Sequence, residues 1–130
     1  MIKKKVLNDK RIRRISGGFG FIPHRFLTDG FFTALDQHQL LLYFFLVLVS
    51  DRYGLSYYAY DSICTTSRLS LEQYIDARNS LIKNDLIDFD GTIFQVLQLP
   101  AVPPAYEPNP TVHSTDIKQL LSKTFKEVPA

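Results

Sequence analysis

The chain has 130 residues, 45% of them hydrophobic, and a formal net charge of +2. This length predicts one domain with tails, whose compact part of about 85–100 residues can bury a core without disulfides or metals. The single cysteine, Cys64, excludes an intrachain disulfide and fits a reducing cytoplasm. The longest apolar run, Leu40 to Val49, is half the roughly 20 residues that a membrane span needs, so it predicts a buried core helix and no membrane anchor.

The charge is concentrated near the N-terminus. Residues 1–25 contain eight Lys/Arg and one acid, Asp9, whereas the remainder contains seven Lys/Arg and twelve Asp/Glu. A basic arm on an acidic body is typical of proteins that bind nucleic acid or another polyanion, although a solvated tail that only aids solubility has the same composition. Residues 1–20 have no helical period and end in a glycine-rich run, so we predict a flexible arm with a hinge.

The first helices follow this arm. Pro23 is typical of a first helical turn and Gly30 of a helix end, so a short helix is expected between them. Asp36, with Gln39 as its capping-box partner, predicts the start of a longer helix that runs to about Ser50. This helix is apolar on every side, which indicates that the domain encloses it or that a second subunit shares it.

An aromatic segment comes next. Residues 55–59 are predicted to form a short strand, followed by a helix from residue 60 or 61 to about Ser67. Three tyrosines lie at this junction: Tyr57, Tyr58 and Tyr60. We interpret them as sheet and core residues, with stacking on nucleic-acid bases as the alternative.

A capped third helix and a hairpin follow. Ser70, with Gln73 three residues later, predicts a helix that ends near Asn84. Its apolar face contains Leu71, Tyr74, Ile75, Arg78, Leu81 and Ile82, and its polar face contains Glu72, Gln73, Asp76, Asn79, Ser80 and Lys83. The pair Asp90-Gly91 lies between two β-rich runs and predicts a two-residue hairpin turn.

Composition changes after Leu99. Five prolines between residues 100 and 113 disfavour a helix or a sheet interior, so this segment is predicted to be a linker. Residues 114–130 can form an amphipathic helix through Ile117, Leu120, Leu121 and Phe125, and its apolar stripe needs a partner.

One series of residues resembles a known family. The series is Asp61-Ser62-Ile63, Leu69-Ser70, Ile75, Ala77-Arg78, Leu81-Ile82 and Asp85-Leu86-Ile87. It resembles the winged helix-turn-helix domains of bacterial transcription regulators and of plasmid or phage replication initiators, and the lead-in from Pro23 to Ser50 looks like the first helices of DnaD-type initiators. The resemblance covers about residues 22–99. It implies a mainly α fold with a small β-hairpin (α+β), a winged helix-turn-helix over residues 21–99, preceded by the arm at 1–20.

In such a family the third helix lies in the major groove and the wing touches the DNA backbone or the minor groove. Carried over by position, Gln73 and Asn79 would contact adenine and Lys83 a phosphate. The third-helix face also carries Glu72 and Asp76, which disfavour phosphate, so we expect the arm to supply most of the charge. The expected DNA-binding residues are therefore Lys3, Lys4, Lys5, Lys10, Arg11, Arg13 and Arg14 of the arm and Ser70, Gln73, Asn79, Ser80 and Lys83 of the third helix.

No arrangement of residues indicates an enzyme. His24, His38 and His113 are far apart and do not form a metal-ligand pattern with Cys64, which is interpreted as a small core residue. We therefore expect no catalytic residues, no metal and no cofactor. The expected function is binding of double-stranded DNA, as a cytoplasmic transcription regulator or replication accessory factor of a bacterial or mobile-element system. The alternative is a protein–protein interaction module without strong DNA binding, and in either case the apolar first helix or the C-terminal helix is the candidate contact for a homodimer.

Overall fold

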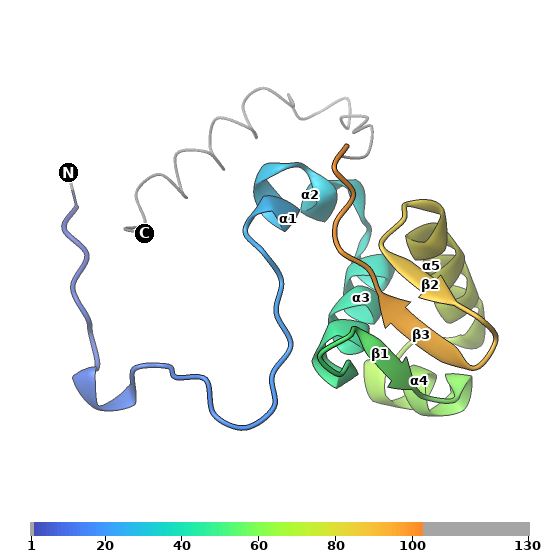
Figure 1. Ribbon diagram of the computed structural model, residues 1–130, viewed down its shortest axis with the longest axis horizontal. Coiled ribbons are helices and arrows are strands. Elements are labelled where there is room, and N and C mark those ends of the chain that lie inside the picture. Colours follow the sequence, from blue (N-terminus) through green and yellow to red (C-terminus); the bar gives the residue numbers. More distant parts are fainter. Residues whose placement is uncertain (1, 103–130) are drawn as a thin grey trace.

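The structure is a computed structural model that describes residues 2–102 (Figure 1). In chain order its elements are the 3-10 turn η1 (Asp9–Arg11), helices α1 (Arg25–Thr28), α2 (Phe31–Ala34) and α3 (Gln37–Val49), strand β1 (Leu55–Tyr57), helices α4 (Tyr60–Ser67) and α5 (Leu71–Lys83), and strands β2 (Ile87–Phe89) and β3 (Ile93–Val96). The predicted α+β class, mainly helical with a small antiparallel sheet, is confirmed. The predicted C-terminal helix and most of the predicted linker lie outside the described residues.

Both predicted capping boxes are present. The Asp36 carboxylate accepts a hydrogen bond of 2.8 Å from the Gln39 backbone N–H, and the Gln39 side-chain oxygen accepts one of 3.1 Å from the Asp36 N–H. Ser70 and Gln73 make the same reciprocal pair at the start of α5. Each box satisfies two backbone donors that a helix start leaves without partners. The capping residue and the glutamine three residues later therefore suffice to predict where both helices begin.

The core lies between the helices and one face of the sheet. Helix α3 contributes Leu42 and Leu46, α4 contributes Ile63, α5 contributes Leu81 and β3 contributes Phe94, all of them fully buried. Figure 1 shows α5 behind β2, and α3 and α4 next to the sheet. This packing leaves the opposite face of the sheet exposed.

Helix α5 buries a slightly different face from the one predicted. Leu71 was expected to be buried but is 51% exposed, whereas Ala77, which the apolar pattern did not include, is buried. Ala77 lies three residues after Tyr74 and four before Leu81, so it shares the buried side of the helix with these two residues.

The strands are ordered β1-β3-β2, and both pairs are antiparallel. In this register Phe89 faces Phe94 across the hairpin, and their rings stack with centroids 4.2 Å apart. The predicted hairpin is present, but its two-residue turn is Gly91-Thr92 and not Asp90-Gly91, because Asp90 pairs with Ile93. The cause is local: the Asp90 carboxylate accepts hydrogen bonds from the N–H groups of Thr92 and Ile93, and Gly91 adopts a φ of 98°.

The N-terminal arm runs away from the rest of the molecule (Figure 1). Residues 2–19 are exposed throughout, and the one regular feature there is η1, whose start is capped by Asn8. Gly20 marks the point where the chain joins the body, because a Cβ at this position would collide with the carbonyl oxygen of Val47 on α3. The expected hinge therefore ends at Gly20, where the backbone packs against α3.

Candidate nucleic-acid interface

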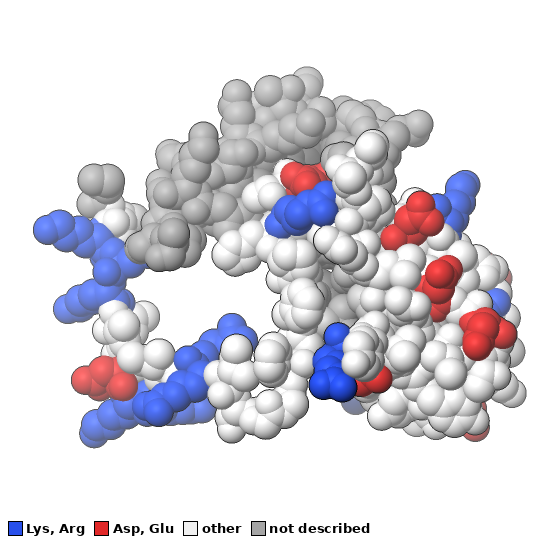
Figure 2. All heavy atoms as spheres, viewed as in Figure 1, with Lys and Arg blue, Asp and Glu red and all other residues white. Residues whose placement is uncertain are grey.

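The arm presents a dense set of cations. All of the predicted phosphate-binding residues of the arm are exposed: Lys3, Lys4, Lys5, Lys10, Arg11, Arg13 and Arg14. Figure 2 shows their positive charges gathered on the arm, away from most of the acidic side chains. Within residues 2–102 none of these cations forms an ion pair, because the single ion pair there involves Arg25 and Asp29. The arm can therefore offer all seven charges to an external polyanion.

The arm is also unusually apolar for an exposed segment. Leu7 is 95% exposed, Ile2 is 91% exposed, and Ile15 is also largely open to solvent. An exposed aliphatic side chain gains free energy when a partner removes it from water. The arm therefore combines charges for a polyanion with apolar groups that can contact sugar, base or protein surfaces.

Arg25 does not belong with these cations, although it was counted in the basic segment. Its guanidinium pairs with the Asp29 carboxylate at 2.9 Å and donates to the carbonyl oxygens of Leu99 and Pro100. It also lies over the Phe31 ring, 5.6 Å from the centroid. Arg25 is therefore a structural residue that connects α1 to the chain leaving the sheet.

The predicted reading residues of α5 are brought together on one side of the helix. Ser70, Asn79 and Lys83 are exposed, and Gln73 and Ser80 are half-buried. Two acids, Glu72 and Asp76, are exposed beside them, as the sequence pattern predicts. Lys83 is thus the one cation on this polar face, which remains close to neutral or negative at physiological pH.

The two amides expected to read adenine are already engaged. The Gln73 side-chain oxygen accepts a hydrogen bond of 2.9 Å from the Ser70 N–H, and the Asn79 side-chain oxygen accepts from Arg78 at 3.3 Å. A bidentate contact to adenine needs both the oxygen and the NH₂ group of the amide. Each amide would therefore have to share or release its present hydrogen bond to read a base in that way.

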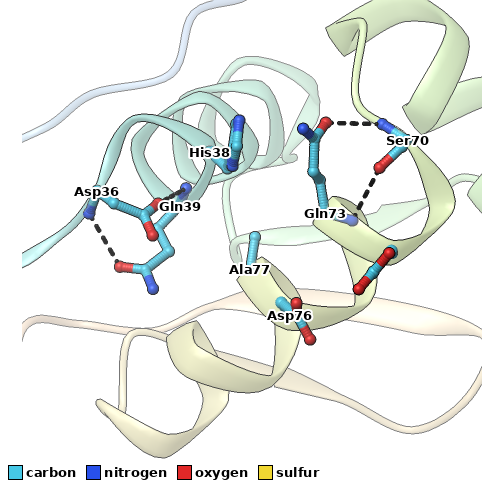
Figure 3. Close-up of a pocket in the computed structure, with 8 residues that line it drawn as sticks. Asp36, His38, Gln39, Ser70, Gln73, Asp76 and Ala77 are labelled. Atoms are coloured by element: carbon cyan, nitrogen blue, oxygen red, sulfur yellow. Dashed lines mark hydrogen bonds between the residues drawn. The ribbon is translucent and has the colours of Figure 1, made fainter.

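A polar hollow of about 400 Å³ lies between the starts of α3 and α5 (Figure 3). Its lining includes both capping boxes, His38 of α3, and the acids Glu72 and Asp76 of α5. The carboxylates make this hollow unsuitable for a phosphate. Among the described residues no three His, Cys, Asp or Glu side chains are placed to hold a metal ion.

A second hollow, of about 350 Å³, has an aromatic lining. It contains Tyr57, Tyr58 and Tyr60, and all three are exposed. Tyr57 does belong to the sheet, but the expectation that these tyrosines pack into the core is wrong, because each of them keeps between 41% and 70% of its surface exposed. The tyrosine cluster is visible in the sequence, but its exposure depends on how α4, α5 and the hairpin meet.

Cys64 is half-buried, and its thiol lies 3.9 Å from the Ser70 carbonyl oxygen, to which it donates. Burial, with a smaller contribution from Asp61, raises the pKa of the Cys64 thiol. The thiol therefore stays protonated at neutral pH, in agreement with its interpretation as a small packing residue.

In the part of the chain from residue 2 to residue 102, every helix is too short or too polar to cross a lipid bilayer. Comparisons of the chain with protein-family models, with curated proteins and with solved structures found no match.

Proposed function

We propose that this protein is a winged helix-turn-helix DNA-binding protein, a transcription regulator or replication accessory factor of a bacterial or mobile-element system. The observation that carries the proposal is the exposed arm, whose seven cations have no acidic partner among residues 2–102. The rest of the described chain, from residue 20 to residue 102, contains five Lys/Arg and nine Asp/Glu. An acidic body with a separate cationic arm favours a polyanion as the ligand of the arm.

The element order supports a winged helix-turn-helix. Helices α4 and α5 are joined by a short turn in which Arg68 adopts a left-handed conformation and Leu69 is buried. The hairpin of β2 and β3 follows α5 directly, where this fold has its wing, and β1 pairs with β3. In this arrangement α5 is the helix that enters the major groove.

The charges favour different roles in DNA binding for the arm and for α5. Each phosphate neutralised by a cation contributes to affinity through counterion release, whereas Glu72 and Asp76 on α5 oppose it. We therefore assign affinity to the arm, and position and sequence preference to α5, with Asn79 and Lys83 as its most exposed contacts. If all seven arm cations neutralise phosphates, the logarithm of the binding constant should fall with the logarithm of the salt concentration with a slope of about −6.

Fluorescence anisotropy on a labelled duplex at several salt concentrations tests the proposal. The full chain should bind at low salt, and deletion of residues 1–14 should remove most of the salt dependence. Arg52→Gln, which removes an exposed cation of the body, is the matched control and should change the slope by one unit at most. Absence of binding at low salt, or an equal slope with and without the arm, would refute the proposal.

A protein–protein interaction module is the second candidate, favoured by the surface of α3. Leu48 is 74% exposed, and Leu41 lies seven residues earlier and is also exposed. Residues seven apart lie on nearly the same side of a helix, so this apolar stripe can pair with a second copy. Light scattering of the full chain and of Leu48→Glu tests this: a dimer lost in the variant supports it, and a strict monomer that binds DNA contradicts it.

A further inference from the structure

The aromatic hollow lies where four parts of the fold meet. These are the end of β1, the start of α4, the middle of α5 and the hairpin turn at Gly91 and Thr92. Five aromatic side chains and one cation supply most of its lining: Tyr57, Tyr58, Tyr60, Tyr74, Phe89 and Arg78.

The walls of this hollow are held in place from behind. Tyr74 is buried, Phe89 stacks on Phe94, and Tyr58 packs edge-on against Phe45 with centroids 5.5 Å apart. In front of this support Tyr57 and Tyr60 are 70% and 58% exposed. The hollow therefore combines rings that pack against the core with rings that are open to solvent.

Arg78 gives the hollow its charge. Its guanidinium lies 5.5 Å from the Tyr74 ring centroid and 5.3 Å from that of Phe89. No carboxylate is among the described residues that line the hollow, in contrast with the acidic hollow at the start of α5. Aromatic rings beside a guanidinium favour a planar ligand that accepts hydrogen bonds and is attached to a negatively charged chain.

We propose that the aromatic hollow binds an unpaired nucleobase of single-stranded DNA, an inference that rests on the proposed DNA-binding function. Tyrosine rings stack on the face of any base, and the Arg78 guanidinium can donate to a base carbonyl oxygen or ring nitrogen. A base in a duplex is stacked and paired and cannot enter the hollow, so the ligand is an unpaired strand or a duplex with an unpaired end. The protein would then hold duplex through the arm and α5 and the adjoining single strand through the hollow.

The test compares binding of the full chain to a short oligothymidine and to a duplex of the same length at one low salt concentration. Tyr57→Ala and Tyr60→Ala should each weaken oligothymidine binding between about fivefold and a hundredfold. Tyr57→Phe keeps the ring and should bind like the unmodified chain. Tyr53→Ala removes an equally exposed tyrosine that does not line the hollow and should also leave binding unchanged.

Duplex binding distinguishes the two proposals. If the duplex binds through the arm but neither Tyr57→Ala nor Tyr60→Ala weakens oligothymidine binding, the hollow is not a base site and this inference fails alone. An equal loss of oligothymidine affinity in Tyr53→Ala would also overturn the inference. It would be overturned as well if a proline-rich peptide bound in the hollow and did not compete with oligothymidine. If neither duplex nor oligothymidine binds at low salt, the proposed function itself fails.

Discussion

Arg25 and Pro100 are 75 residues apart in the chain, and the Arg25 guanidinium donates a hydrogen bond of 2.6 Å to the Pro100 carbonyl oxygen. Through this contact α1 holds the segment that leaves β3. The first helix is therefore joined to the segment that follows the last strand of the sheet.

Replacing Arg25 should destabilise the fold. Arg25→Ala removes two hydrogen bonds to backbone carbonyls and a partly exposed ion pair, so we expect the free energy of unfolding to fall by about 1–2 kcal/mol. Arg25→Lys keeps the charge but loses the planar fork and should recover only part of this. Urea unfolding followed by circular dichroism measures the change. Arg13→Ala, on the exposed arm, is the control, and an equal effect of the two alanine variants would contradict the structural role of Arg25.

A buried serine offers a gain in stability. The Ser67 hydroxyl is buried and has no hydrogen-bond partner within the described chain, so Ser67→Ala should raise the free energy of unfolding by about 1 kcal/mol. Ser50→Ala is the contrasting variant, because the Ser50 hydroxyl donates a hydrogen bond of 2.9 Å to the Val47 carbonyl oxygen. The melting temperature should rise for Ser67→Ala and fall for Ser50→Ala. A lower melting temperature for Ser67→Ala would show that its hydroxyl is satisfied in solution.

Asp90 in the hairpin turn should make the free energy of unfolding depend on pH. Hydrogen bonds from the N–H groups of Ile93 and Thr92 hold the pKa of the Asp90 carboxyl below its usual range. The folded state therefore takes up this proton less readily than the unfolded chain, whose aspartates titrate near about 3.9. The carboxylate stabilises the fold above that pH, and its contribution is lost as the pH falls through the lowered pKa.

Asp90→Asn keeps an acceptor but cannot ionise, so it isolates this effect. The difference in urea midpoint between the unmodified chain and Asp90→Asn should be largest at neutral pH and should shrink below about pH 4. A difference that stays constant from neutral to acidic pH would show that the charge of Asp90 does not contribute.

The acids of α5 should oppose DNA binding. If α5 approaches the phosphates, Glu72→Gln and Asp76→Asn should each strengthen duplex binding by about two- to fivefold at low salt. Asp85→Asn makes the same change in charge beyond the end of α5, at a left-handed residue that asparagine tolerates, and should have a smaller effect. Anisotropy titrations compare the three variants. Equal effects would indicate that the whole body, and not this face of α5, sets the repulsion.

The features that the sequence predicts well depend on neighbours along the chain. The capping boxes of Asp36 and Ser70 need only a partner three residues later, and both helices begin where those residues place them. The burial of Ala77 depends on how the other elements pack around α5, which the spacing of apolar residues within α5 does not contain. The role of Arg25 requires a segment 75 residues away to fold back onto α1.

The candidate site divides in the same way. The arm cations and the polar face of α5 follow from composition and helical spacing. The hairpin register does not, because the Asp90 carboxylate and the stacking of Phe89 on Phe94 together displace the turn by one residue. The exposure of Tyr57 and Tyr60 depends on three elements meeting around them, so no local pattern distinguishes these residues from core tyrosines.

The contact of Gly20 with Val47 has a consequence for how far the protein can search. It fixes one end of the arm on α3, so the cations are tethered and not free in solution. The eighteen residues from 2 to 19 can extend by at most about 60 Å, the length of roughly 18 base pairs. When the body is bound at one site, the arm can therefore reach phosphates over nearly two helical turns of DNA on either side. A bulkier residue at position 20 would move the point where the arm leaves the body, and with it the stretch of DNA that the arm can reach.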